Sequence, residues 1–267
     1  ELNDIGMVVA SQTDNLVPLD KVVYALRDVS GTTESIPLIA VSIMSKKIAS
    51  GADKILIDIK VGKGALLKTM KDARNLKDIM IRIGARYNKE VRCLISEMDN
   101  PLGMCVGNSL EVAEAVELLD GKVKNNLYDL CVDIASNMVS MALGCSMIKA
   151  RKAVIDSIES KKAYNKLLEF VNYQHGNLDK MKISKSKIEV QSSRSGVVKS
   201  IDAHKISEIS CLLGSGKMKK DDIIDHEVGV FLNKLVGDKV ERGDVICTIY
   251  CNKIKKDFGI ENAYVIE

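Results

Sequence analysis

The sequence predicts an α/β protein: a mixed, mostly parallel sheet covered by helices, with a helical hairpin near the start and a small C-terminal α+β domain. Two observations predict this class. Strand and helix patterns alternate through the middle of the chain, which is typical of a parallel sheet with covering helices. Short strands and repeated Gly-Asp turns then follow a Lys- and Ser-rich connector at residues 177–186, which indicates a separate domain.

Hydrophobic periodicity predicts the individual elements, because β-branched runs favour strands and apolar residues three and four apart favour helices. The expected helices are residues 20–29, 37–50, 67–87, 108–119, 127–143, 146–158, 162–173 and 204–213. The expected strands are residues 6–10, 54–59, 91–95, 188–191, 196–201, 229–235 and 245–250. The first strand enters a turn at residues 11–15, so we expect the chain to begin inside a domain.

These elements group into four expected parts. They are residues 1–12 as the truncated start of the α/β core, 13–50 as the helical hairpin, 51–176 as the α/β core and 187–267 as the C-terminal α+β domain.

Composition indicates a globular protein with a substantial core. The chain has 267 residues, of which 46% are apolar, and its 39 basic and 36 acidic residues leave a net charge of only +3. The two signs are interleaved, so no nucleic-acid partner is expected. No apolar run approaches the roughly 20 residues that span a bilayer. We therefore expect no membrane association and a cytoplasmic location.

Cysteine and histidine usage does not indicate a metal or redox centre. The seven Cys are scattered through apolar stretches without a Cys-x-x-Cys pair, so we expect reduced, buried thiols. Cys247 and Cys251 would share a strand face, but a metal site needs more ligands than this pair. His175, His204 and His226 have no nucleophile partner pattern, and we interpret them as surface or capping residues.

Six segments carry the most specific signal in the sequence, namely Gln12–Pro18, Tyr24–Asp28, Ser35–Ile39, Asp58–Ala65, Asp99–Gly103 and Gly107–Val112. In this order they resemble the thymidine phosphorylase and pyrimidine-nucleoside phosphorylase family, over essentially the whole chain. The resemblance places the hairpin in an all-α lobe. It implies phosphorolysis of pyrimidine nucleosides to free base and pentose 1-phosphate by a homodimer, with phosphate as co-substrate and no organic cofactor.

The resemblance also implies a base-binding site on the hairpin, formed by Tyr24, Arg27, Ser42 and Lys46. The spacing fits this role, because residues three and four apart share a helix face. Arg27 and Lys46 are the catalytic candidates, since they would stabilise the negative charge that grows on the departing base. The alternative is that both side chains lie on solvated helix faces, paired with Asp28 or Glu34.

A monovalent cation such as potassium is the second implied ligand. Its expected ligands are the backbone carbonyls of Leu102 and Cys105 and the Glu114 carboxylate, and such oxygen ligands suit a hard ion. The alternative is that Glu114 is simply an exposed helix residue.

Phosphate binding is where the sequence departs from the family pattern. The family holds phosphate with a Lys-His-Ser-Thr-Gly-Gly loop that this sequence does not contain, and Gly62-Lys63-Gly64 is by itself a weak phosphate signal. We therefore expect this fragment alone to be inactive. The alternative is a truncated or degenerate paralogue that binds a pyrimidine weakly or only a partner chain. A biotinyl or lipoyl carrier is disfavoured, because Lys217-Met218-Lys219 follows a helix.

Overall fold

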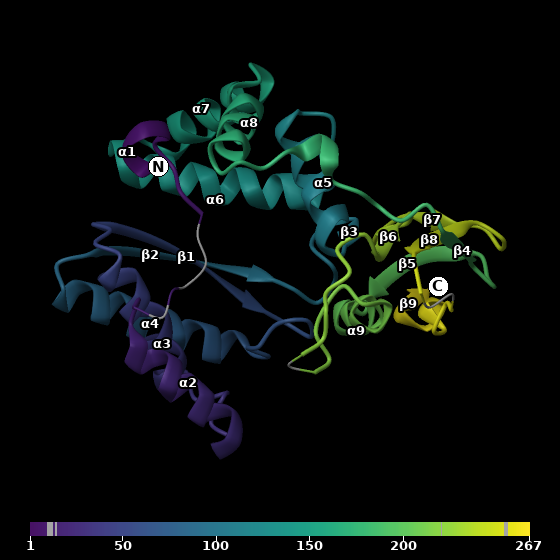
Figure 1. Ribbon diagram of the computed structural model, residues 1–267, viewed down its shortest axis with the longest axis horizontal. Coiled ribbons are helices and arrows are strands. Elements are labelled where there is room, and N and C mark those ends of the chain that lie inside the picture. Colours follow the sequence, from purple (N-terminus) through teal and green to yellow (C-terminus); the bar gives the residue numbers. More distant parts are fainter. Residues whose placement is uncertain (10–12, 14, 220, 254–255) are drawn as a thin grey trace.

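A computed structural model describes residues 1–9, 13, 15–219, 221–253 and 256–267, and it has the α/β class expected from the sequence. A sheet of two strands lies between helices on both faces, and the C-terminal domain stands to one side (Figure 1). The helices are α1 (Leu2–Ile5), α2 (Pro18–Ser30), α3 (Ile36–Ala49), α4 (Met70–Arg86), α5 (Asn108–Leu119), α6 (Asn126–Leu143), α7 (Met147–Glu159), α8 (Lys162–Tyr173) and α9 (Ala203–Leu213), with short 3-10 turns at Leu178–Lys180 and Ile260–Ala263. The strands are β1 (Lys54–Val61), β2 (Glu90–Glu97), β3 (Cys105–Val106), β4 (Lys187–Gln191), β5 (Gly196–Ile201), β6 (Gly229–Leu232), β7 (Lys239–Val240), β8 (Val245–Tyr250) and β9 (Tyr264–Ile266).

The sheet of β1 and β2 is parallel, with Lys54 opposite Glu90 and Val61 opposite Glu97. One face of this sheet is apolar and packs against α3 and α4, where Ile55, Ile59 and Met80 form part of one buried cluster. The other face carries polar side chains and lies toward α6, so that Arg92 donates to Asn137 of α6 at 3.2 Å. The hairpin is tied to the core through α3, because Ile39, Ala40 and Met44 belong to the same buried cluster.

The C-terminal domain contains two antiparallel sheets around one apolar core. Their strand orders are β3-β6-β8-β4 and β7-β5-β9. Ile206 of α9, Val230 of β6 and Ile249 of β8 are fully buried in this core. The strand β3 comes from the segment that we expected to belong only to the α/β core, and it pairs with β6. The two parts of the chain therefore share a sheet.

The expectation of a strand at residues 6–10 is wrong for the described part of that segment. Residues 7–9 form no strand, and α1 precedes them. This end of the chain lies against α8, since Lys166 donates to the carbonyl of Ile5 at 3.1 Å and Gln174 to the carbonyl of Val9 at 2.9 Å. A strand requires hydrogen bonds to a neighbouring strand, and the Val9 carbonyl accepts instead from the side chain of Gln174, the residue that follows α8. Residues 10–12 and 14 of the expected turn lie outside the described residues.

By length and composition, no single helix in the described parts of the chain could cross a membrane, although α6 and α7 together pass that test across a bend of 118°.

Candidate functional site

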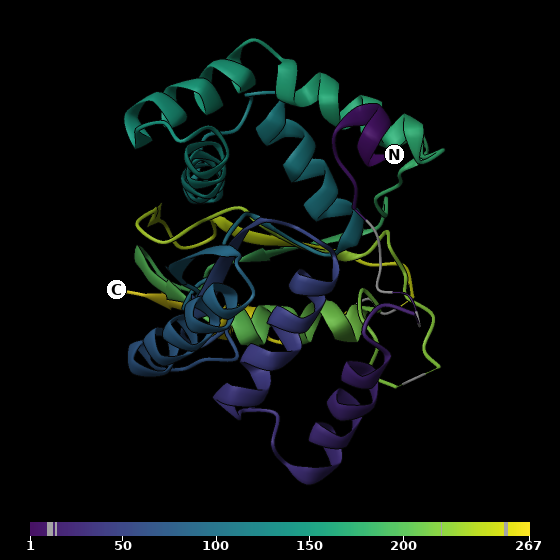
Figure 2. The same ribbon diagram turned by 90° about the vertical axis from the view of Figure 1, so that its left-hand side faces the viewer.

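The hairpin of α2 and α3 brings the four residues expected to bind a base onto facing helices, at the edge of the molecule (Figure 2). Tyr24 and Arg27 lie on α2, and the Arg27 guanidinium stands 5.2 Å from the centroid of the Tyr24 ring. Ser42 and Lys46 lie one turn apart on α3, where the Lys46 ammonium donates to the Ser42 hydroxyl at 3.2 Å. Ser42 is buried, and Tyr24 is 53% exposed.

Asp20 joins the two pairs and was missed by the sequence analysis. Its carboxylate is buried and forms an ion pair with Lys46, which bridges α2 to α3. Burial alone would raise the pKa of Asp20, but hydrogen bonds from Lys46 and Ser42 and the charges of Lys46 and Arg27 outweigh it and lower that pKa. Asp20, Tyr24 and Arg27 are spaced four and three residues apart, so their shared helix face was a usable signal in the sequence.

Arg27 is buried, so its side chain does not lie on a solvated helix face. Its Nε donates to the carbonyl of Thr32 at 3.4 Å, and its Nη2 donates to the carbonyl of Thr33. The guanidinium therefore holds the connection between α2 and α3. The suggested pairing of Arg27 with Asp28 cannot be assigned, because the side chain of Asp28 lies outside the described residues, and Glu34 is exposed.

Glu114, the expected cation ligand, is buried rather than an exposed helix residue. Its carboxylate accepts hydrogen bonds from the backbone N–H of Met104 at 2.8 Å, from that of Cys105 at 3.1 Å and from the Asn125 amide at 3.1 Å. Gly103 allows this close approach, since a Cβ there would lie 2.4 Å from Glu114 Oε2. The carboxylate thus lies beside the segment that carries the Leu102 and Cys105 carbonyls. Burial, followed by the charge of Glu114, raises the pKa of the Cys105 thiol to about 12.

The Gly62–Gly64 turn uses its backbone N–H groups inside the protein. Gly62 donates to the carbonyl of Leu67 at 3.0 Å, Lys63 to Asp99 Oδ1 at 2.8 Å and Gly64 to the carbonyl of Met98 at 2.9 Å. A phosphate cradle needs N–H groups that point at the anion. This turn therefore docks β1 against the end of β2 and offers no such cradle.

A further polar cluster lies on the sheet face toward α6. The Ser96 hydroxyl donates to Asp58 at 2.6 Å and accepts from Lys60 at 2.8 Å, and Lys60 also pairs with Asp58. Nothing in the strand pattern predicted this contact, because it joins β1 to β2 across the sheet.

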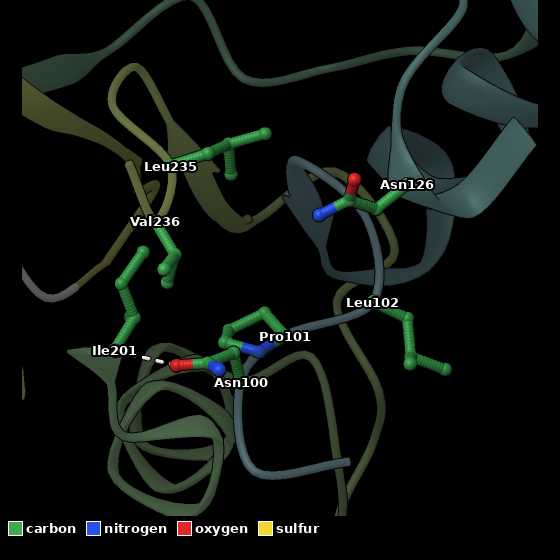
Figure 3. Close-up of a pocket in the computed structure, with 7 residues that line it drawn as sticks. All are labelled: Asn100, Pro101, Leu102, Asn126, Ile201, Leu235 and Val236. Atoms are coloured by element: carbon green, nitrogen blue, oxygen red, sulfur yellow. Dashed lines mark hydrogen bonds between the residues drawn. The ribbon is translucent and has the colours of Figure 1, made fainter. Parts of the chain in front are cut away.

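Several cavities surround the segment Asn100–Gly103, where the α/β core meets the C-terminal domain. One of about 150 Å³ lies between Asn100, Asn126 and Val236, and the Asn100 side chain accepts a hydrogen bond from the backbone of Ile201 at 2.8 Å (Figure 3). Another, of about 340 Å³, is lined by Leu102, Cys105 and Glu114. An ion bound beside Glu114 would face this second cavity. In the described residues, no group of three His, Cys, Asp or Glu side chains has the geometry of a metal site.

The remaining candidates have ordinary surroundings. Burial raises the pKa of Cys247 to about 12 and that of Cys93 to about 11, as expected for inert core thiols. His204 lies on the surface, 3.7 Å from Glu208. Lys217 to Lys219 follow α9 and precede β6, so in the described chain they do not form a hairpin tip.

Comparisons with known proteins match both parts of the chain. Residues 1–164 match the model of the glycosyl transferase family a/b domain, and residues 197–263 match the pyrimidine nucleoside phosphorylase C-terminal domain. The chain is 42% identical over 276 residues to a pyrimidine-nucleoside phosphorylase of Staphylococcus epidermidis, which covers 100% of the chain and 64% of the relative. It is 42% identical over 270 residues to that of Bacillus subtilis, covering 98% of the chain and 62% of the relative.

The chain thus spans between 60% and 64% of the length of these curated relatives, including the 41% identical protein of Staphylococcus aureus strain USA300, which covers 94% of the chain. The family match includes the a/b domain and the C-terminal domain in the same order as the two parts of the fold. The chain therefore belongs to the pyrimidine-nucleoside phosphorylase family of glycosyl transferases.

Proposed function

We propose that this chain provides the base-binding part of an enzyme that cleaves pyrimidine nucleosides with phosphate, releasing the free base and a (deoxy)ribose 1-phosphate. The observation that carries the proposal is the gathering of Arg27, Ser42 and Lys46 around the buried Asp20 on two facing helices. The relatives named pyrimidine-nucleoside phosphorylase support the reaction class.

The chemistry explains why cationic donors belong at this place. A phosphate oxygen attacks the anomeric carbon of the sugar, and the glycosidic bond breaks with its electron pair left on the base. Donors aimed at that developing charge stabilise the transition state, and removal of one such donor typically costs on the order of 100-fold in rate. An ammonium has three N–H donors. Two of those of Lys46 point to Asp20 and Ser42, and we assign the third to a base carbonyl.

A second candidate is a pyrimidine-binding chain without turnover. The observation that favours it is the Gly62–Gly64 turn, whose backbone N–H groups are engaged within the protein. Phosphate would then need residues other than this turn.

One assay separates the two candidates. The full-length protein that contains this chain is incubated with uridine or thymidine, with and without inorganic phosphate, and released uracil or thymine is quantified by chromatography. Phosphate-dependent release that falls at least about 100-fold in both Arg27→Ala and Lys46→Ala supports the enzyme. Base binding without release supports the second candidate. Turnover in both variants that equals the turnover of the unmutated protein would exclude the proposed roles of Arg27 and Lys46.

We also propose a monovalent cation, such as potassium, at Leu102, Cys105 and Glu114. The buried Glu114 carboxylate beside the 102–105 backbone supports it, since oxygen ligands suit a hard ion. The test compares thermal unfolding in potassium, sodium and a large organic cation. Stabilisation specific to potassium that disappears in Glu114→Gln supports the site, and equal unfolding temperatures in all three salts contradict it.

We propose a homodimer as the assembly, and the exposed apolar residues of α2 support this proposal. Leu19, Val22, Leu26 and Val29 are all exposed and lie three or four residues apart, so they form one apolar stripe on α2. This set is called the α2 stripe below. A second copy of the chain could bury such a stripe. Cytoplasmic action is likewise a proposal, which cell fractionation tests.

A further inference from the structure

The Asn125 side chain joins the start of α6 to the buried Glu114 carboxylate. We propose that Asn125 is the positioning residue of the cation site: its amide fixes one oxygen of Glu114, so that the other is held beside the backbone of residues 102–105 for a monovalent cation. This inference rests on the proposed cation site and adds to it the residue that orients its carboxylate.

Asn125 forms two hydrogen bonds of opposite polarity. It is the N-cap of α6, where its Oδ1 accepts from the backbone N–H of Tyr128 at 3.0 Å, and its Nδ2 donates to Glu114 Oε1 at 3.1 Å. A half-turn of the amide would place its oxygen against the carboxylate and its NH2 group against the Tyr128 N–H, so both bonds would be lost. The cap therefore fixes the direction in which the amide donates.

The two oxygens of Glu114 have different surroundings. Oε1 accepts from the backbone N–H of Met104 at 2.8 Å and from Asn125 at 3.1 Å, whereas Oε2 accepts from the backbone N–H of Cys105 at 3.1 Å. A carboxylate oxygen has about two lone pairs. Of the two oxygens, Oε2 therefore has the greater remaining capacity for an ion, and it lies against Gly103, where a Cβ would be 2.4 Å away.

The cavity beside this carboxylate favours a positive charge. Its volume is about 340 Å³, and among the described residues that line it are two acidic side chains, Glu111 and Glu114, and no basic one. A buried carboxylate is costly unless an opposite charge compensates it, and oxygen ligands suit a hard ion. Mutation of a residue that orients a metal ligand typically changes the affinity for the metal by about 10- to 100-fold. The contribution of Asn125 should therefore be measurable as a change in ion affinity.

The test separates the two hydrogen bonds of Asn125. Serine is about as good an N-cap residue as asparagine, so Asn125→Ser keeps an acceptor for the Tyr128 N–H and removes the amide that reaches Glu114. Asn125→Ala removes both. The full-length protein that contains this chain is unfolded by heat at increasing concentrations of potassium chloride, with tetramethylammonium chloride added to keep the ionic strength constant. The rise of the unfolding temperature with potassium gives the dissociation constant of the ion.

We expect potassium to stabilise the unmutated protein, and both Asn125→Ser and Asn125→Ala to raise the dissociation constant of potassium at least about tenfold. Without potassium, Asn125→Ala should unfold at a lower temperature than Asn125→Ser, because it also loses the cap. Asn125→Thr is a second variant that keeps the cap and should behave as Asn125→Ser. The matched control Asn177→Ser replaces another N-cap asparagine, whose side chain accepts from the Asp179 N–H at 2.8 Å, and should leave the dissociation constant unchanged.

The possible failures are distinguishable. An unmutated protein that potassium stabilises no more than tetramethylammonium overturns the cation site and this inference together. Potassium-specific stabilisation with the same dissociation constant in Asn125→Ser overturns the inference alone, because the amide would then not orient the carboxylate. A dissociation constant that rises in Asn125→Ala but not in Asn125→Ser also overturns it, because the cap of α6 and not the bond to Glu114 would then determine ion affinity.

Discussion

The C-terminal domain and helix α2 use their side chains in opposite ways. In the C-terminal domain most buried residues are apolar, and Ile206, Val230 and Ile249 are completely inaccessible to solvent. In α2 the buried side chains among those described are Asp20 and Arg27, whereas the α2 stripe faces solvent. An isolated surface helix normally buries its apolar face. The inverted pattern fits the binding role proposed for α2, whereas the C-terminal domain has the apolar core of a packed domain.

The largest expected effect on stability comes from shortening a side chain in the C-terminal core. Ile249→Ala removes a fully buried side chain from β8 and should lower the free energy of unfolding by about 2 to 5 kcal/mol, because it leaves a cavity. The measurement is denaturant unfolding followed by circular dichroism. Val265→Ala in β9, where the side chain is 44% exposed, is the control and should change stability by less than about 1 kcal/mol. Similar losses in the two variants would contradict the assigned core.

The polar contact of α2 should contribute a smaller, pH-dependent stability. Asp20→Asn should lower the free energy of unfolding by about 1 to 2 kcal/mol near neutral pH, since it weakens a hydrogen-bonded ion pair with Lys46. The folded protein lowers the pKa of Asp20, so this stabilisation is present above the ordinary pKa of Asp, about 4, and is lost as the pH falls through the folded-state value.

Unfolding curves of the wild-type chain and Asp20→Asn across this range measure the effect. The difference between them should be constant near neutral pH and should shrink below about pH 4. A difference that is independent of pH would mean that the variant disturbs packing and not the ion pair.

The smallest effect on stability is expected at the α2 stripe. Leu26→Glu places a charge at a position that is 57% exposed, so the free energy of unfolding should change by less than about 0.5 kcal/mol. The same variant should reduce self-association, measured by sedimentation equilibrium, if a second copy covers the stripe. Glu substitution at Tyr87, which is 58% exposed on another surface, is the matched control. Unchanged assembly in Leu26→Glu would remove the proposed role of the stripe.

Local patterns predicted most elements of both regions. The bounds of β5, β8, α5 and α8 agree with the sequence expectations, because β-branched alternation and helical spacing are local properties. The strand β3 was not expected. It is two residues long and pairs with β6, far along the chain, so no periodic signal marks it. The misassigned strand at residues 6–10 shows the converse, since strand-like composition does not supply a pairing neighbour.

The candidate site was predictable in part. Tyr24, Arg27, Ser42 and Lys46 were identified through the family resemblance, and the structure brings them onto facing helices. Spacing alone could not show that Arg27 binds the carbonyls of Thr32 and Thr33, because that contact depends on the path of the connection between the helices. The bond from Asp20 to Lys46 joins residues 26 positions apart, and only the packing of α2 on α3 creates it.

The central claim is that α2 and α3 form a pyrimidine-binding site, and titration of the isotopically labelled chain with uracil tests it most directly. The account predicts that NMR shift changes concentrate at Tyr24, Ser42 and their neighbours, and that they disappear in the folded Lys46→Ala variant. Shift changes confined to the cavities around Asn100 to Gly103, or the same changes in Lys46→Ala, would contradict it.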